Sequence, residues 1–200
     1  MVEPNVIAIV QARVGSTRLP NKVLSDIVGK PLLWHIIKRL VSIKKIDEVA
    51  IATSTLSEND VLYDFAQENN IYCHRGSEND VISRFYEATR IKGAKHIIRI
   101  TADCPLVDPF IISDLIDYYF DNSYDFCGIA CGAGVYNEKN ILRYPDGLDA
   151  EIFSFAVLEN AFKNATELSH REHVTPYIWK NKNLFNIGTC LLYTSPSPRD

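Results

Sequence analysis

The stretch IAIVQARVGSTRLPNK, residues 7–22, decides how the rest of the chain is interpreted. It continues the apolar run Val6–Val10, whose β-branched residues are typical of a strand buried on both faces. A loop follows with one glycine, two hydroxyl side chains and the cations Arg13, Arg18 and Lys22. Backbone amides, hydroxyls and fixed positive charge all bind phosphate oxygens. The alternative is a solvated basic loop, but a strand followed by a glycine-containing loop is the context that phosphate-binding motifs require.

The bulk composition limits the classes of function. The 200 residues are 46% hydrophobic and 23% charged, as in ordinary globular proteins, and this length predicts one domain with a sizeable core. The net charge is 21 − 25 = −4, so the chain has no overall basic field for nucleic acid. The cations of residues 13–22 are therefore a local feature, and we expect them to bind a small anionic ligand.

Cysteine usage and hydropathy indicate the compartment. The cysteines are odd in number, without a C-x-x-C pair, which favours reduced thiols over a disulfide framework or a zinc site; they are Cys73, Cys104, Cys127, Cys131 and Cys190. No apolar run reaches membrane-spanning length, and the N-terminal residues show no signal-peptide pattern. We therefore expect a cytoplasmic protein that does not act on a membrane.

Strand patterns alternate with helical patterns along the chain. After the first strand, strand-like runs occur at residues 48–53, 71–74, 96–101 and, more weakly, 124–128. Amphipathic helical spacing occupies the intervals, with Pro31 predicted as the first residue of one helix and Asp108-Pro109 as the N-cap and first residue of another. This alternation predicts an α/β fold with a mostly parallel sheet and helices on both faces.

The last residues change character abruptly. Residues 191–200 read LLYTSPSPRD, and Ser-Pro-Ser-Pro suits neither a helix nor a strand interior. We therefore expect one nucleotide-binding domain over residues 1–190. The remaining residues are expected to form a disordered tail, a candidate for foreign sequence in place of a lost C-terminus.

Acidic residues follow two of the predicted elements. Asp103 comes just after the strand at 96–101, at the edge where open α/β sheets bind ligands; the alternative is an Asx-turn before Pro105. Residues 145–151 hold three carboxylates, Asp146, Asp149 and Glu151. A Pro-Asp-Gly turn leading into a strand explains part of this pattern, and a second role facing a metal or a sugar stays open.

Several further polar residues have a structural interpretation. Ser169-x-x-Glu172 matches a capping box, which accounts for Glu172 at a helix start. His170 and His173 could share a helix face, but nothing nearby completes a metal site. Taken alone, the residues 75–77 are a turn before a capped helix.

Residues 12–22, ARVGSTRLPNK, resemble the A-R-x-G-S-x-R-L-P-x-K signature of the cytidylyltransferases that activate sugar acids as CMP-sugars. Within this family the chain resembles the spore coat polysaccharide biosynthesis protein F branch. The resemblance extends from about Val6 to Thr189 through RGSENDV at 75–81, RITADCPLVDP at 99–109, YPDGLDAE at 144–151 and REHVTP at 171–176. It implies a Rossmann-like nucleotide-diphospho-sugar transferase fold, with residues 1–190 as an incomplete cytidylyltransferase domain.

The resemblance also implies roles for individual residues. Arg13, Lys22 and Asp103 are the predicted catalytic residues, and Asp103 matches a Mg²⁺-ligating aspartate. The predicted nucleotide-binding residues are the loop members Ala12, Arg13, Gly15, Ser16, Arg18 and Lys22, and Arg75 and Ser77 where the family places its base-recognising loop. The predicted sugar-binding residues are Asp146, Asp149 and Glu151, together with Arg143, which is added on its charge and location.

The implied reaction is CTP + sugar → CMP-sugar + pyrophosphate, with a sugar acid as the expected acceptor in surface polysaccharide synthesis. The expected partners are CTP and the sugar, without nucleic acid or membrane, and a homodimer is left open. Family members continue to a Trp-x-x-Asp-like strand with another metal-binding aspartate, so we expect a truncated member. Two alternatives remain: a nucleotide-sugar-dependent glycosyltransferase, although the chain has no Asp-x-Asp tripeptide, and a catalytically inactive CTP-binding fragment.

Overall fold

The computed structural model describes residues 5–15, 19–129, 144–145 and 147–190. The predictions for Ser16, Arg18, Arg143 and Asp146, and for the tail at 191–200, lie outside these residues. The strands are β1 (Val6–Gln11), β2 (Asp26–Ile27), β3 (Lys30–Pro31), β4 (Glu48–Ser54), β5 (Tyr72–Gly76), β6 (His96–Thr101), β7 (Phe126–Ile129), β8 (Glu151–Ser154) and β9 (Ile187–Cys190). The α-helices are α1 (Leu32–Val41), α2 (Asp60–Glu68), α3 (Val81–Lys92), α4 (Pro109–Asp121), α5 (Phe155–Asn164), α6 (Leu168–His173) and α7 (Pro176–Lys180), and the 3₁₀ helices are η1 (Lys22–Leu24) and η2 (Ser57–Asn59).

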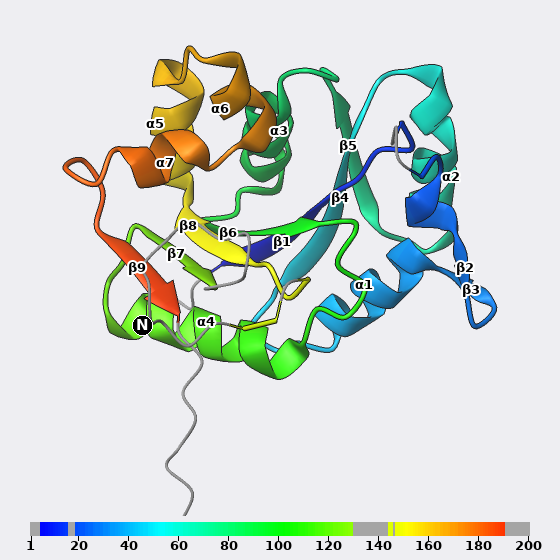
Figure 1. Cartoon of the computed structure of the whole chain (residues 1–200), viewed down its shortest axis with the longest axis horizontal. Coiled ribbons are helices and arrows are strands. Elements are labelled where there is room, and N and C mark those ends of the chain that lie inside the picture. Colours follow the sequence, from blue (N-terminus) through cyan, green and yellow to red (C-terminus); the bar gives the residue numbers. More distant parts are fainter. Residues whose placement is uncertain (1–4, 16–18, 130–143, 146, 191–200) are drawn as a thin grey trace, which may run out of the picture.

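In the described part of the chain, seven strands form one sheet in the order β5-β4-β1-β6-β8-β7-β9 (Figure 1). The pairs β1–β4, β1–β6, β4–β5 and β7–β9 are parallel. Only β8 runs antiparallel to its neighbours, β6 and β7. The predicted mostly parallel sheet is therefore confirmed, while the sequence pattern did not reveal the reversed direction of β8.

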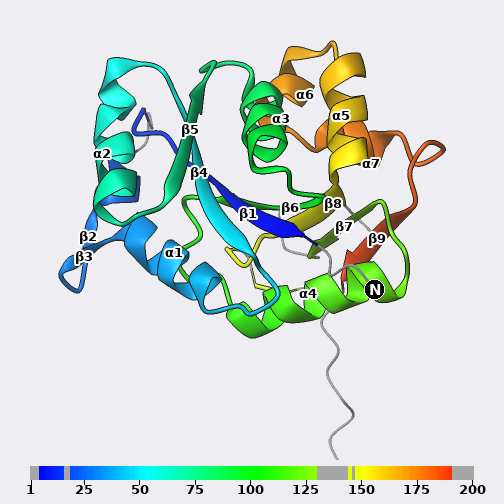
Figure 2. The ribbon, with the colours of Figure 1, turned by 180° about the vertical axis from the view of Figure 1, so that it is seen from behind.

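Helices cover both faces of the sheet, as predicted. Val6, Ala8 and Val10 pack into a core with α1, α2 and α4, whereas Ile7 and Ile9 pack into a second core with α3, α5 and α7. Figure 1 shows α1 and α4 below the sheet and α3, α5 and α7 above it, and Figure 2 shows these layers from behind. Because successive strand residues point to opposite faces, a strand between two helical layers must be apolar at every position.

The two predicted proline helix starts have different outcomes. Asp108 and Pro109 are confirmed: the Asp108 carboxylate accepts two backbone amides of the first turn of α4, at 2.8 and 3.2 Å. Pro31 is not the first helical residue, because it pairs with Asp26 in the β2–β3 hairpin and α1 begins at Leu32. Its ψ of 146° is extended, so the chain enters the helix one residue later.

The order of the strands creates a place for a ligand. The chain passes from β1 to β4 and β5 on one side, then returns to β6 on the other side of β1. The carboxyl ends of β1 and β6 therefore form a topological switch point, where open α/β sheets bind ligands. None of the described helices combines the length and the apolar character that a membrane crossing needs.

Candidate active site

A cleft of about 370 Å³ opens at the carboxyl ends of β1 and β6. Its lining is rich in charged and polar side chains, and consists of Gln11, Arg13, Gly15, Lys22, Val23, Arg99, Thr101, Ala102, Asp103 and His173. The structure thus brings together Arg13, Gly15, Lys22 and Asp103 of the predicted site residues. A larger hollow of about 600 Å³ is lined by residues 182–187, which include no carboxylate. The cleft differs from this larger hollow in its charged side chains of both signs, not in having the greater volume.

Buried hydrogen bonds fix the start of the phosphate loop. The Ala12 amide donates to the carbonyl of Ala52 at 3.1 Å, and the Val14 amide donates to Oδ1 of Asn59 at 2.9 Å. Asn59 is fully buried, and its Nδ2 donates to the hydroxyl of Ser54 at 2.8 Å. Arg13 lies between the two anchored amides. The backbone around Arg13 is therefore held against the end of β4. Asn59, which makes one of these contacts, was not singled out in the sequence analysis.

The same loop turns back so that Lys22 faces the cleft. The Asn21 amide donates to the Val14 carbonyl at 3.1 Å, and Asn21 has a left-handed φ of 57°, which asparagine tolerates better than most residues. Gly15 has no positive φ, so the turn itself does not demand glycine. A Cβ at Gly15 would instead lie 2.9 Å from Oε1 of Glu58, so glycine allows this close approach.

Lys22 and Asp103 form an open ion pair across the cleft. Lys22 Nζ lies 2.8 Å from Oδ2 of Asp103, and the two side chains are 29% and 51% exposed. Partial burial would raise the pKa of Asp103, but hydrogen bonds from Lys22 and Thr101 and the Lys22 charge outweigh it and lower the pKa. Asp103 is therefore an ionised carboxylate at neutral pH.

The donors at this end of the cleft fit a divalent cation such as Mg²⁺. Mg²⁺ is usually held by one or two carboxylates together with substrate phosphates and water. Asp103 supplies one ionised carboxylate beside the hydroxyl of Thr101. Among the residues that the structure describes, no group of three or more His, Cys, Asp and Glu side chains could hold a metal ion by itself. A cation at Asp103 would therefore need oxygens from the nucleotide.

The two histidines of α6 have separate surroundings. The Nε2 atom of buried His170 lies 3.1 Å from both Lys180 Nζ and Glu167 Oε2. His173, in contrast, lines the cleft. The sequence analysis found no metal site for this pair, and the structure places only one of the two histidines at the cleft.

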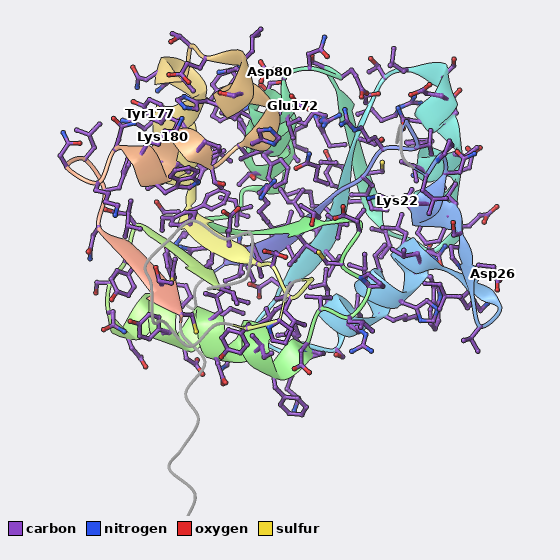
Figure 3. The ribbon with its side chains drawn as sticks, in the orientation of Figure 1. Lys22, Asp26, Asp80, Glu172, Tyr177 and Lys180 are labelled. Atoms are coloured by element: carbon purple, nitrogen blue, oxygen red, sulfur yellow. The ribbon has the colours of Figure 1, made fainter. Side chains whose placement is uncertain are left out.

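Arg13 is held by carboxylates from two other elements. Its Nη1 lies 3.3 Å from Oε1 of Glu78, in the loop before α3, and its Nη2 lies 3.7 Å from Oε1 of Glu172, on α6. Figure 3 shows Glu172 near Asp80, where α6 approaches α3. The predicted capping box is wrong, because α6 begins at Leu168 and no side chain caps it. Glu172 faces the phosphate loop instead.

Arg99, in one wall of the cleft, forms a second ion pair that is only slightly exposed. Arg99 Nη1 lies 2.7 Å from Oε2 of Glu151, with side chains 15% and 14% exposed. The Thr175 hydroxyl donates to both Glu151 oxygens at 2.9 and 3.1 Å, and Arg99 Nη2 donates to Oε1 of Gln11 at 3.4 Å. Glu151 was predicted to face the sugar, but both of its oxygens already have protein partners.

The other described members of the predicted site do not line the cleft. Asp149 accepts the Gly147 amide at 3.2 Å and so closes its own turn. Arg75 donates to the Ser54 and Leu56 carbonyls and lies 2.6 Å from Oδ1 of Asp60. Two further predicted nucleotide-binding residues also lie outside the cleft lining. Ala12 is buried, and the Ser77 hydroxyl accepts a hydrogen bond from the Asp80 amide at 3.2 Å.

The sequence analysis did not assign several cleft residues to the site. For some of them the sequence held a usable signal, and for others it held none. Gln11 and Thr101 are the last residues of β1 and β6, so a polar residue ending an apolar run was an available signal. Arg99 lies within β6, where its position in an apolar strand was a further signal. His173 of the cleft lining, and Glu172, which pairs with Arg13, come from α6, far along the chain, and no local pattern connects that helix with the phosphate loop.

Residues 7–196 match the family model described as Cytidylyltransferase. The chain belongs to the cytidylyltransferase family. It is therefore a nucleotidyltransferase by family, and the match extends from β1 through every element that lines the cleft.

Individual proteins agree with the family assignment. The chain is 31% identical over 188 residues to the spore coat polysaccharide biosynthesis protein SpsF of Bacillus subtilis, covering 92% of this chain and 73% of that protein. A cytidylyltransferase structure from Leptospira borgpetersenii superposes with a TM-score of 0.81 at 26% identity, covering 98% of this chain and 79% of the other. A CMP:2-keto-3-deoxy-manno-octonic acid synthetase complexed with CTP has the same fold, with a TM-score of 0.71 at 19% identity over 95% and 90% of the two chains.

Proposed function

We propose that the chain transfers CMP from CTP to a hydroxyl group of a sugar acid and releases pyrophosphate, as a step in surface polysaccharide synthesis. The observation that carries the proposal is the meeting of Arg13, Gly15, Lys22 and Asp103 in one cleft at the switch point of the sheet. The cytidylyltransferase family and the resemblance to a spore coat polysaccharide protein support it.

In this proposal Arg13 and Lys22 bind the β and γ phosphates of CTP. The guanidinium of Arg13 can donate two parallel hydrogen bonds to phosphate oxygens, and Lys22 adds a compact charge. The sugar hydroxyl attacks the α-phosphorus in line and loses its proton to solvent. A new P–O bond forms, and the bond between the α-phosphorus and the oxygen that bridges to the β-phosphate breaks. The two cations stabilise the negative charge that pyrophosphate gathers as it leaves.

Asp103 would hold the Mg²⁺ together with phosphate oxygens of the nucleotide. The cation supplies Lewis-acid stabilisation of charge on those oxygens. Asp103 is paired with Lys22 in the structure; on binding, Asp103 would hold the cation and Lys22 would contact the triphosphate. The pair thereby keeps both groups ordered and in place before the ligands bind.

The other predicted contacts remain part of the proposal. Ala12, Ser16 and Arg18 belong to the same loop, and Arg75 and Ser77 are the predicted base contacts. The proposed sugar contacts are Arg143, Asp146, Asp149 and Glu151. Of these, Glu151 could also act indirectly, by holding Arg99 in the wall of the cleft.

Pyrophosphate release tests the proposal directly. CTP with Mg²⁺ is incubated with a panel of sugar acids, and ATP, GTP and UTP serve as nucleotide controls. We expect pyrophosphate from CTP with one class of sugar acid. CTP binding without pyrophosphate from any sugar would indicate an inactive CTP-binding protein. Sugar transfer from a nucleotide-sugar, with no pyrophosphate, would indicate a glycosyltransferase.

A further inference from the structure

Arg84, in the first turn of α3, is a buried cation. Its side chain is 1% exposed, and its Nε and Nη1 atoms have no hydrogen-bond partner. It forms no ion pair with any residue that the structure describes. A buried charge without a partner is costly, so a side chain kept in this state needs an explanation.

The structure makes room for the Arg84 side chain at the end of β5. A Cβ at Gly76 would lie 2.9 Å from Cγ of Arg84 and 3.7 Å from its Cδ. Any other residue at this position would push against the stem of Arg84. Burial lowers the pKa of Arg84 and the negative charge of Glu78 raises it, but an arginine stays protonated in proteins. The site therefore holds a permanent positive charge.

Glu78 is the carboxylate available to this charge. Its Oε1 is paired with Nη1 of Arg13 at 3.3 Å, while its Oε2 is buried and has no hydrogen-bond partner. Asp80 also acts electrostatically on Arg84, but its two oxygens are already used. One accepts the Ser83 amide that caps α3, and the other is paired with Arg171 of α6. Buried atoms without hydrogen-bond partners, Oε2 of Glu78 and Nε and Nη1 of Arg84, thus belong to two opposite charges within electrostatic reach of each other.

We propose that Glu78 exchanges partners, from Arg13 in the ligand-free protein to Arg84 when a triphosphate binds Arg13. This inference rests on the proposed function, because it requires Arg13 to bind the triphosphate of CTP. In the bound state both arginines and the carboxylate have partners of opposite charge, whereas in the free state Arg84 has none. Arg84 and Glu78 are then positioning residues, which act on the nucleotide only through Arg13.

The exchange predicts a specific pattern in a double-mutant cycle. In Arg84→Met the released Glu78 has no second partner, so it stays on Arg13, and we expect about tenfold weaker CTP binding. In Glu78→Gln no carboxylate at position 78 competes with the triphosphate for Arg13. The CTP affinity of this variant should be within about threefold of wild type. The double variant should match Glu78→Gln, because without the carboxylate the loss of Arg84 no longer matters.

Isothermal titration calorimetry with CTP and Mg²⁺ measures these affinities on the whole chain. Arg90→Met is the matched control, because Arg90 lies on the same helix but pairs with Glu87 at the surface. We expect wild-type affinity for the control, and Arg84→Lys should recover part of the loss. If Arg84→Met does not fold, Arg84→Gln in the two Glu78 backgrounds provides the same cycle, because it also removes the positive charge. A merely structural role for Arg84 would lower stability in urea unfolding and leave the CTP affinity unchanged.

The outcomes separate this inference from the proposed function. If wild type binds CTP and the Arg84 variants bind it equally well, the exchange is overturned and the proposed function stands. If the double variant loses as much affinity as Arg84→Met, Arg84 does not act through Glu78, and the exchange is overturned as well. A wild-type chain that binds no CTP would overturn both.

Discussion

Two ion pairs lie at the same cleft, Lys22–Asp103 and Arg99–Glu151. Their distances are similar, but they differ in exposure and in the elements that they join. Lys22 and Asp103 lie 2.8 Å apart with side chains 29% and 51% exposed. Arg99 and Glu151 lie 2.7 Å apart with side chains 15% and 14% exposed, and Thr175 also donates to Glu151. The first pair joins the start of η1 to the loop after β6, whereas the second joins neighbouring strands β6 and β8.

The difference teaches which charges can respond to a ligand. An exposed pair is worth less than about 1 kcal/mol, so a triphosphate and a cation can replace its partners at little cost. Breaking a fully buried pair by removing one partner costs about 3–5 kcal/mol, because the remaining charge stays buried, and the slightly exposed Arg99–Glu151 pair is expected at the lower end of this range. We therefore expect Lys22 and Asp103 to be exchanged during binding, and Arg99 and Glu151 to stay paired as part of the wall.

The largest expected effect is on stability, at the less exposed Arg99–Glu151 pair. Glu151→Gln keeps the shape and the contact with Thr175 but leaves Arg99 without its counter-charge, so we expect a loss of about 3 kcal/mol in the free energy of unfolding. Urea unfolding measures it. Asp117→Asn is the matched control, because it breaks the exposed Lys45–Asp117 pair, with side chains 42% and 55% exposed. A Glu151→Gln loss no larger than that of the control would show that both pairs are equally replaceable.

The next effect is on activity, at the open pair. Lys22→Ala should lower kcat/KM by about 100-fold, or about 2.7 kcal/mol of transition-state stabilisation, while the free energy of unfolding changes by less than about 1 kcal/mol. Pyrophosphate release from CTP measures the rate. Lys45→Ala, at a surface pair away from the cleft, should retain the wild-type rate. A near-normal rate in Lys22→Ala would rule out its role at the phosphates.

A smaller effect concerns the coupling between metal and nucleotide. Asp103→Asn should remove the increase in CTP affinity that Mg²⁺ produces, which we expect to be about tenfold in wild type. Calorimetry with CTP, in the presence and absence of Mg²⁺, measures this increase. Asp117→Asn again serves as the control. Unchanged coupling in Asp103→Asn would mean that Asp103 is not the ligand.

The smallest effect is a pH dependence of stability, measured without metal or nucleotide. The pKa of Asp103 is lower in the folded chain than the value of about 3.9 in an unfolded one, so its stabilising contribution is present above that value. It is lost as the pH falls through the folded-state pKa, and because Asp103 is half exposed it is less than about 1 kcal/mol. The difference in unfolding free energy between wild type and Asp103→Asn, measured by urea from pH 6 to pH 3, should therefore shrink. A difference that is constant or grows would contradict the Lys22–Asp103 pairing.

The sequence by itself determined the features that depend on local pattern. The fully apolar run at 6–10 predicted a strand with helices on both sides, and the structure has this strand between two cores. Asp103, which follows β6, was predicted to lie at the ligand-binding edge of the sheet, and the family resemblance assigned it to one site with Arg13 and Lys22. Arg13, Lys22 and Asp103 do line one cleft there.

Only the tertiary structure decided which distant groups meet. The motif at 169–172 has the residues of a capping box, but α6 begins at Leu168, so Ser169 lies inside the helix, and Glu172 pairs with Arg13 instead. The reversed direction of β8 places Glu151 opposite Arg99, and the absence of a Cβ at Gly76 makes room for Arg84. Hydrophobic periodicity reports which face of an element is buried, whereas ion pairs depend on the relative position of elements far apart in the chain. The composition of the cleft could therefore be predicted in part, and its pairing of charges could not.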